Sequence, residues 1–149
     1  MRIYCKKTHA FGSIIPIVYH PFLPVKLMNR SDNSKSIEIE GLIDSGADCS
    51  VISSVYAKKL LDVDFKNGRV QKTSGISTQK IDVYYHEIDL EVLGMADSKC
   101  RILIGFMEGL KVGLLLGRKD FFDSFRITFD MINYAFEIET YSTIFALRN

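Results

Sequence analysis

Short runs of alternating apolar and polar residues recur along the chain, and they constrain its fold more than any other feature. The clearest run is Ile37-Glu38-Ile39-Glu40, and a second extends from Glu87 to Val92. A period of two places every second side chain on one face, as in a half-buried β-strand. The sequence therefore predicts a mainly β protein.

Other strand-like segments lie on either side of these two runs. The apolar stretch from Ile14 to Leu27 contains three prolines, which favour extended segments over a helix. Further strands are predicted at Leu42-Ile43, Cys100 to Ile104 and Leu114 to Leu116, and a last hairpin joins Ile127–Phe129 to Tyr134–Ile138.

Turns and helices are fewer. Asn67-Gly68 is typical of a two-residue hairpin turn, and a second hairpin is expected from Val70 to Tyr84 around Ser74-Gly75. Ser50 to Leu61 is the one segment with clear helical spacing of apolar residues. A brief helix is also expected from Asp120 to Phe125.

Size and composition limit the class of protein. With 149 residues, 47% of them hydrophobic, the chain is predicted to form one domain spanning residues 1–149. A net charge of +1 gives no reason to expect a nucleic-acid partner. The most apolar stretch, Ile102 to Gly117, is too short to span a bilayer, so no membrane segment is expected. Three widely spaced cysteines favour a reducing compartment, and the expected location is the cytoplasm.

One acidic residue stands at the end of an apolar strand. Asp44 follows Leu42-Ile43 and opens the tripeptide Asp44-Ser45-Gly46. By itself such a tripeptide is more often a local turn closed by the aspartate side chain. Burying an ionised carboxylate is unfavourable unless it reaches water or its pKa is shifted. Shifted pKa values are frequent at functional sites. The strand before it, the helix expected after it and a second apolar strand ending at Gly117 favour the functional interpretation.

At these residues the chain resembles the retropepsin-like aspartic peptidases, especially their short single-domain prokaryotic members. The matching segments are Leu42-Ile43-Asp44-Ser45-Gly46-Ala47-Asp48, the helix expected after it, a flap-like hairpin around Thr73-Ser74-Gly75-Ile76, Leu115-Leu116-Gly117-Arg118, and Phe125 to Asp130. The resemblance covers about residues 24–138. It implies a closed, antiparallel β-barrel-like acid-protease fold with one or two short helices.

The resemblance also implies a role for each matching residue. Asp44, Ser45 and Gly46 would form the catalytic motif, and Ala47, Asp48, Gly75, Ile76 and Arg118 would contact the substrate. An ion pair between Asp48 and Arg118 is expected, and Gly75 and Ile76 would form the tip of the flap. Because the chain holds one such motif, a homodimer is expected in which each subunit supplies one Asp44.

The expected function is that of an aspartic endopeptidase, which hydrolyses polypeptides by activating water between two Asp44 carboxylates. Neither a metal nor another cofactor is expected, since Cys5 and His9 have no second ligand pair nearby in the sequence. Two alternatives remain open. The first is a peptide-binding or interaction module that keeps this fold without cleaving, which the glycine-poor flap sequence favours. The second is a monomer in which Asp44 is structural.

Overall fold

The computed structural model describes residues 1–9, 14–15, 17–73 and 80–141. Its strands are β1 (Arg2–Tyr4), β2 (Lys6–His9), β3 (Ile17–His20), β4 (Phe22–Met28), β5 (Ser36–Ile43), β6 (Ser50–Ser53), β7 (Arg69–Thr73), β8 (Ile81–Val92), β9 (Cys100–Met107), β10 (Leu114–Leu116), β11 (Phe125–Asp130) and β12 (Ala135–Thr140). The helical segments are short: η1 (Ser54–Tyr56), α1 (Ala57–Leu60), η2 (Phe65–Asn67) and η3 (Arg118–Phe122). The prediction of a mainly β protein is confirmed.

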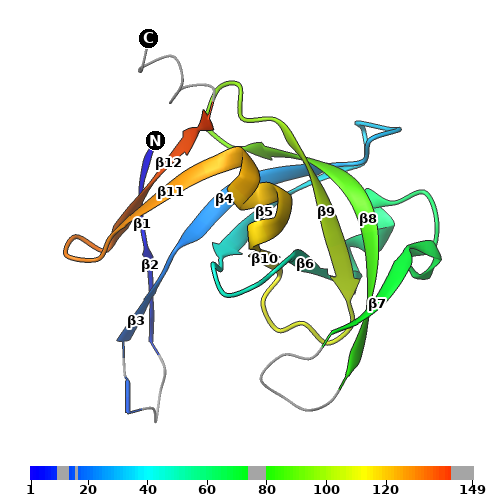
Figure 1. Ribbon diagram of the computed structural model, residues 1–149, viewed down its shortest axis with the longest axis horizontal. Coiled ribbons are helices and arrows are strands. Elements are labelled where there is room, and N and C mark those ends of the chain that lie inside the picture. Colours follow the sequence, from blue (N-terminus) through cyan, green and yellow to red (C-terminus); the bar gives the residue numbers. More distant parts are fainter. Residues whose placement is uncertain (10–13, 16, 74–79, 142–149) are drawn as a thin grey trace.

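The largest sheet closes on itself. Its strands lie in the order β4-β5-β10-β6-β9-β8-β7, and β8 also pairs with β4. The closed barrel therefore consists of β4, β5, β10, β6, β9 and β8. β7 lies outside it and pairs with β8 as a hairpin (Figure 1). Closure leaves the barrel strands with few free edges.

The interior of the barrel is filled by aliphatic side chains and one large ring. Leu23, Val25 and Leu27 of β4 and Ile88 and Leu90 of the adjacent strand β8 belong to this core, and all are fully buried. Ile102, Ile104 and Phe106 of β9 complete this core and are also fully buried. The alternation read in Glu87 to Val92 corresponds to this burial, since Ile88, Leu90 and Val92 point inward.

A second layer is built from the two ends of the chain. β1, β12 and β11 form a three-stranded antiparallel sheet in that order. Phe125, Phe136 and Ile138 bury one face of this sheet against the barrel core. β2 and β3 pair with each other as a separate ribbon that projects beyond the barrel (Figure 1). The final hairpin predicted from the sequence is confirmed.

Two features of the barrel differ from the sequence predictions. The helix expected from Ser50 to Leu61 is wrong in its first four residues, which form β6 between β10 and β9. Pairing on both sides outweighs the helical spacing there. The barrel is also not wholly antiparallel, because β10 runs parallel to β5 and β6 runs parallel to β9.

One turn and one helix also differ from the sequence predictions. Asn67-Gly68 does not make a hairpin turn: η2 ends at Asn67 and Gly68 has an extended conformation with φ −69°. Asp64 begins this segment by accepting a hydrogen bond from the amide of Lys66 at 3.0 Å, so a local cap replaces the turn. The helix expected from Asp120 begins instead at Arg118 and is interrupted at Lys119 and Asp120.

Candidate active site

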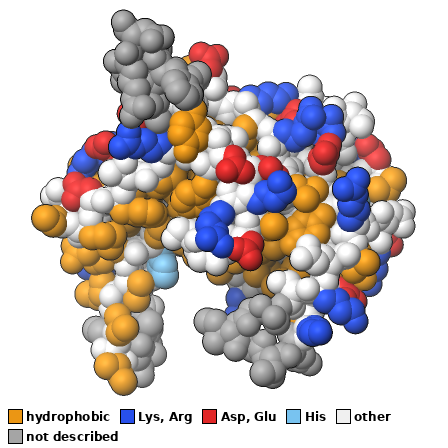
Figure 2. Space-filling view, viewed as in Figure 1, with side chains coloured by type: hydrophobic (Ala, Val, Ile, Leu, Met, Phe, Trp, Pro, Cys, Tyr) orange, Lys and Arg blue, Asp and Glu red, His pale blue; other side chains and the backbone are white. Residues whose placement is uncertain are grey.

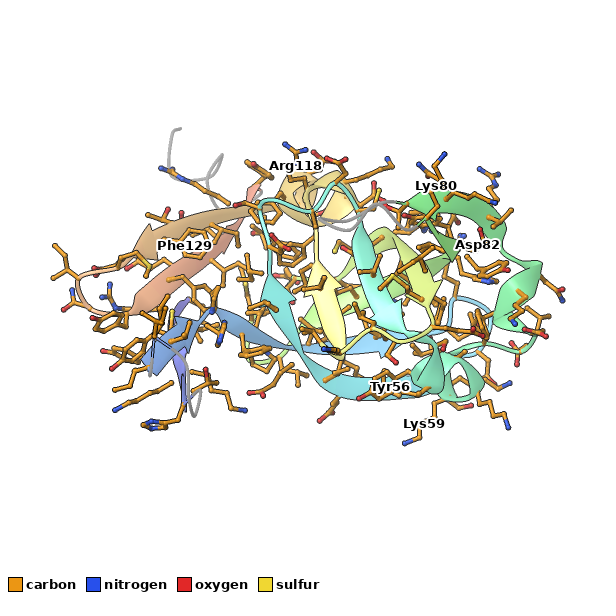
Figure 3. All side chains as sticks on the ribbon, turned by 90° about the horizontal axis from the view of Figure 1, so that it is seen from below. Tyr56, Lys59, Lys80, Asp82, Arg118 and Phe129 are labelled. Carbon is orange, nitrogen blue, oxygen red and sulfur yellow. The ribbon has the colours of Figure 1, made fainter. Side chains whose placement is uncertain are left out.

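Asp44 lies where β5 ends, beside the end of β10. Leu116 of β10 is the register partner of Ile43, and the amide of Asp44 donates to the carbonyl of Leu116 at 3.0 Å. Figure 3 labels Arg118 at this end of the barrel, where β5, β10 and β6 lie side by side. The parallel pairing of β5 with β10 thus brings together the two motifs that the sequence analysis singled out.

The segment from Asp44 to Cys49, called here the site loop, is attached to the chain that follows β10. The amide of Arg118 donates to the carbonyl of Ala47, and the amide of Lys119 donates to the carbonyl of Asp48, both at 2.8 Å. Backbone hydrogen bonds at both ends of the loop fix its path across the end of β10. The carboxylate of Asp44 therefore stands on an ordered segment although the segment is not part of a strand.

Gly117 is required for this close approach. A Cβ atom at this position would lie 2.4 Å from the carbonyl carbon and oxygen of Cys49 and 3.0 Å from the carbonyl oxygen of Ala47. Real Cβ atoms do not approach backbone so closely, so only glycine fits without moving the loop. The buried hydroxyl of Ser50 accepts a hydrogen bond from the amide of Gly117 at 3.1 Å, which ties β6 to the same point.

The carboxylate of Asp44 is partly buried and has a defined orientation. Its Oδ1 atom accepts a hydrogen bond from the amide of Gly46 at 2.9 Å. This bond is the one that a local aspartate turn makes, and it fixes the orientation of the carboxylate. Ser45 and Gly46 are exposed, so this side of the loop is accessible to another molecule.

The expected ion pair between Asp48 and Arg118 is present. Nη2 of Arg118 donates to Oδ1 of Asp48 across the site loop. Both side chains are well exposed, so the pair adds little to stability. Both charged groups lie at the surface, one on the site loop and the other just after β10.

Tyr85 of β8 is a residue of this region that the sequence analysis missed. Its register partner is Gly105 of β9, and a Cβ atom on that glycine would lie 3.0 Å from the Tyr85 ring. The Tyr85 ring therefore shares the space that the missing side chain leaves with Val83, whose Cγ1 would lie 2.3 Å from the same Cβ. Burial raises the pKa of Tyr85 to about 12, with smaller contributions from Cys49 and Asp48 of the site loop. Tyr85 of β8 is thus close enough to the site loop for Cys49 and Asp48 to affect its pKa.

The structure brings together six of the eight site residues predicted from the sequence. Asp44, Ser45, Gly46, Ala47 and Asp48 lie on the site loop, and Arg118 lies beside it. Gly75 and Ile76 lie outside the described residues, although β7 and β8 pair as the hairpin prediction requires. Tyr85 and Ser50 were missed, since a lone tyrosine in a strand and a serine in a supposed helix carry no motif.

A cleft of about 750 Å³ lies beside α1 and η2, among Ala57, Leu61, Phe65 and Glu108, and it does not include Asp44. No cluster of three or more His, Cys, Asp or Glu side chains suited to a metal occurs among the described residues. None of the described helices has the length and apolar character needed to cross a membrane.

Comparison with solved structures identifies the fold. The chain is similar to a retropepsin-like aspartic protease from Rickettsia conorii, with a TM-score of 0.53 and 15% identity over 93% of this chain and 98% of that one. It is also similar to the retroviral protease-like domain of Ddi1 from Leishmania major, with a TM-score of 0.51 and 14% identity over 80% and 89%. No protein-family model and no curated protein sequence matches the chain. The fold is that of the retropepsin-like aspartic proteases.

Proposed function

We propose that this chain is one subunit of a homodimeric aspartic endopeptidase whose active site contains one Asp44 from each copy. The observation that carries the proposal is the attachment of the Asp44 loop to β10 through Leu116 and Gly117. A carboxylate held on ordered backbone at an accessible rim is suited to proton transfer. The retropepsin-like fold supports the same assignment.

The chemistry follows from placing two carboxylates in one site. Like charges about 3 Å apart cannot both be ionised, so the two Asp44 side chains share one proton and titrate as a pair. The ionised Asp44 takes a proton from a water molecule, whose oxygen attacks the peptide carbonyl carbon. The protonated Asp44 donates its proton to the carbonyl oxygen, and the tetrahedral intermediate then breaks its C–N bond as a proton passes to the leaving amine.

The neighbours of Asp44 have positioning and binding roles in this proposal. The amide of Gly46 orients the carboxylate through its bond to Oδ1. Ser45 is exposed on the loop, and its hydroxyl is proposed to bond to the loop of the second subunit. Asp48 and Arg118 are proposed to bind the peptide backbone, with Ala47 beside them and Gly75 and Ile76 closing over the substrate.

The decisive experiment replaces Asp44 by asparagine, which keeps the size of the side chain and its acceptor oxygen. Asp44→Asn is expected to leave the solution mass unchanged. It is expected to lower the rate of hydrolysis of a peptide library by about 10²–10⁴-fold, the usual contribution of general acid–base catalysis. Cleavage is followed by mass spectrometry from acidic to neutral pH. Asp97→Asn is the matched control: it removes the same charge from an exposed turn and is expected to cleave like the wild type.

Cleavage that survives Asp44→Asn at the wild-type rate would exclude this mechanism. A compound that mimics the tetrahedral intermediate provides a second test, since a ligand that binds only the native state raises the melting temperature. It is expected to stabilise the wild type and not the Asp44→Asn variant.

The non-catalytic peptide-binding module is the second candidate, and the sequence from Thr73 to Gln79, with one glycine, favours it. The two candidates differ in one measurement. A binding module would retain peptides from the library without shortening them, and Asp44→Asn would leave their affinity unchanged.

A further inference from the structure

The N-terminal ribbon, defined as β2 and β3 with residues 14–15, is a two-stranded sheet that stands apart from the other two sheets. Its two strands pair with each other over Lys6–His9 and Ile17–His20, and in the described residues they belong to no larger sheet. An isolated two-stranded hairpin is at best marginally stable in water. The ribbon also presents free strand edges, which favour pairing with another chain.

Apolar side chains gather on the ribbon and on the turn between β11 and β12. Ile14 is 100% exposed, Ile132 is 91% exposed, and Ile17, Phe129 and Met131 are also exposed. Figure 2 shows apolar side chains along the projecting ribbon and over the adjacent end of the molecule, where the turn lies. Figure 3 labels Phe129 on the part of the β11–β12 hairpin that extends past the barrel.

These two groups of residues form one surface. The ring of Tyr19 in the ribbon stacks on the ring of Tyr134 beside the turn, with centroids 3.8 Å apart. Ile17 lies two residues from Tyr19 and so on the same face of the ribbon. Met131 and Ile132 are within three residues of Tyr134 in the turn. The exposed residues Ile14, Ile17, Phe129, Met131 and Ile132 are called here the terminal apolar surface, and contiguous apolar surfaces of this kind mark interaction sites.

The ribbon begins next to the strand that carries Asp44. The carbonyl of Pro21, between β3 and β4, accepts a hydrogen bond from the amide of Ile43 at 3.0 Å. Nζ of Lys6 in β2 pairs with Oε2 of Glu40 in β5 at 2.6 Å. A molecule that brings a second carboxylate to Asp44 therefore approaches the rim from which the ribbon projects.

We propose that the terminal apolar surface is the main self-association surface of this chain and that its occupant is the same surface of a second copy. The choice of a second copy rests on the proposed function, because one chain holds one Asp44 and the site requires two. In a two-fold dimer each copy presents the same patch, so the ribbon of each subunit packs on the ribbon and β11–β12 turn of the other. This arrangement covers the exposed isoleucines and supports both ribbons.

The test uses substitutions at positions where the subunit fold has little to lose. Ile14→Asp and Ile132→Asp each place a charge at a fully or almost fully exposed side chain. Each is expected to weaken dimerisation by about tenfold or more, since burial of an isoleucine is lost twice in a two-fold interface. Sedimentation equilibrium over a range of concentrations measures the dissociation constant, and circular dichroism verifies that the subunits stay folded.

Val55→Asp is the matched control. Val55 is 75% exposed on η1, outside the terminal apolar surface, and its substitution is expected to leave the dissociation constant unchanged. Equal dissociation constants for the wild type, Ile14→Asp and Ile132→Asp would overturn the proposal, because another surface would then hold the dimer. A wild-type protein that stays monomeric at every concentration would overturn it as well.

The solution mass and the rate of peptide cleavage, measured together, distinguish a failure of this proposal from a failure of the proposed function. A dimer that dissociates in Ile14→Asp but cleaves no peptide would support the surface and contradict the peptidase. An active dimer that stays intact in both Ile14→Asp and Ile132→Asp would support the peptidase and contradict the proposed self-association surface.

Discussion

The barrel and the terminal layer use similar apolar residues in opposite ways. In the barrel, Ile88, Ile104 and Phe106 are fully buried, and the pairing of β8 with β4 completes the sheet. In the terminal layer, Phe136 is buried against that core, whereas Ile132, four residues away, is 91% exposed. The barrel completes its own hydrophobic core, whereas the terminal layer ends in apolar side chains that are exposed among the described residues.

The largest expected effect is on the free energy of unfolding, and it tests whether the barrel core stabilises the single subunit more than the terminal layer does. Phe106→Ala removes a fully buried ring and is expected to lower the free energy of unfolding by about 3–5 kcal/mol. Phe129→Ala removes the same ring from a side chain that is 42% exposed, and is expected to cost about 1 kcal/mol or less in the dissociated subunit. Urea unfolding at low protein concentration measures both, and equal losses would contradict the contrast between the two regions.

The next effect concerns the junction between the barrel and the site loop. Gly117→Ala places a methyl group against the backbone of Cys49 and is expected to cost about 1–3 kcal/mol, as overpacking does. The loop must move away from β10, so the amides of Asp44 and Arg118 are expected to exchange with solvent faster than in the wild type. Hydrogen exchange followed by NMR measures this, and unchanged protection of both amides would show that the loop tolerates a side chain there.

A smaller effect appears at alkaline pH in the barrel. Burial raises the pKa of Tyr85 to about 12, so the folded state favours the neutral phenol. This contribution to stability is complete below the ordinary tyrosine value of 10 and is lost as the pH rises toward 12. Tyr85→Phe is expected to flatten the decline of unfolding free energy over that interval, and an unaltered profile would exclude Tyr85 as its source.

The smallest effect appears at acid pH in the terminal layer. The Asn133 side chain, and after it the guanidinium of Arg2, holds the pKa of Asp130 at about 2. This contribution to stability is present above the ordinary aspartate value of 3.8 and is lost as the pH falls through about 2. Asn133→Ala is expected to raise the pKa of Asp130, as measured by NMR titration of its carboxyl carbon. Ile132→Ala in the same turn is expected to leave this pKa unchanged.

Local sequence patterns were sufficient to predict much of the fold. Alternation identified β5 through Ile37 to Glu40, and the apolar run Leu114 to Leu116 identified β10 up to its last residue. The final hairpin was recognised because two strand-like runs, Ile127–Phe129 and Tyr134–Ile138, lie on either side of the short segment Asp130 to Asn133. In each case the residues that pack against one another are close in sequence or follow a simple period.

Long-range pairing explains what the sequence did not reveal. Ser50 to Ser53 becomes a strand only because Leu114 and Gly105 lie on either side of it. The place of Tyr85 depends on a glycine in a neighbouring strand, and no local signal reports that pairing. The motifs at Asp44 and Gly117 were both recognised, but the hydrogen bonds that join them follow from the parallel register of β5 and β10.

The placement of β10 between β5 and β6 has a consequence for the order of folding. β10 separates two strands that are consecutive in sequence, and the pair Asp48 and Arg118 is 70 residues apart. Contacts of such sequence separation form late, because the entropy of closing the intervening chain must be overcome first. During synthesis the site loop thus lacks its supporting backbone partners until β10 has left the ribosome and entered the sheet. A chain built in this way cannot assemble the surroundings of Asp44 before Arg118 and Lys119 have been synthesised.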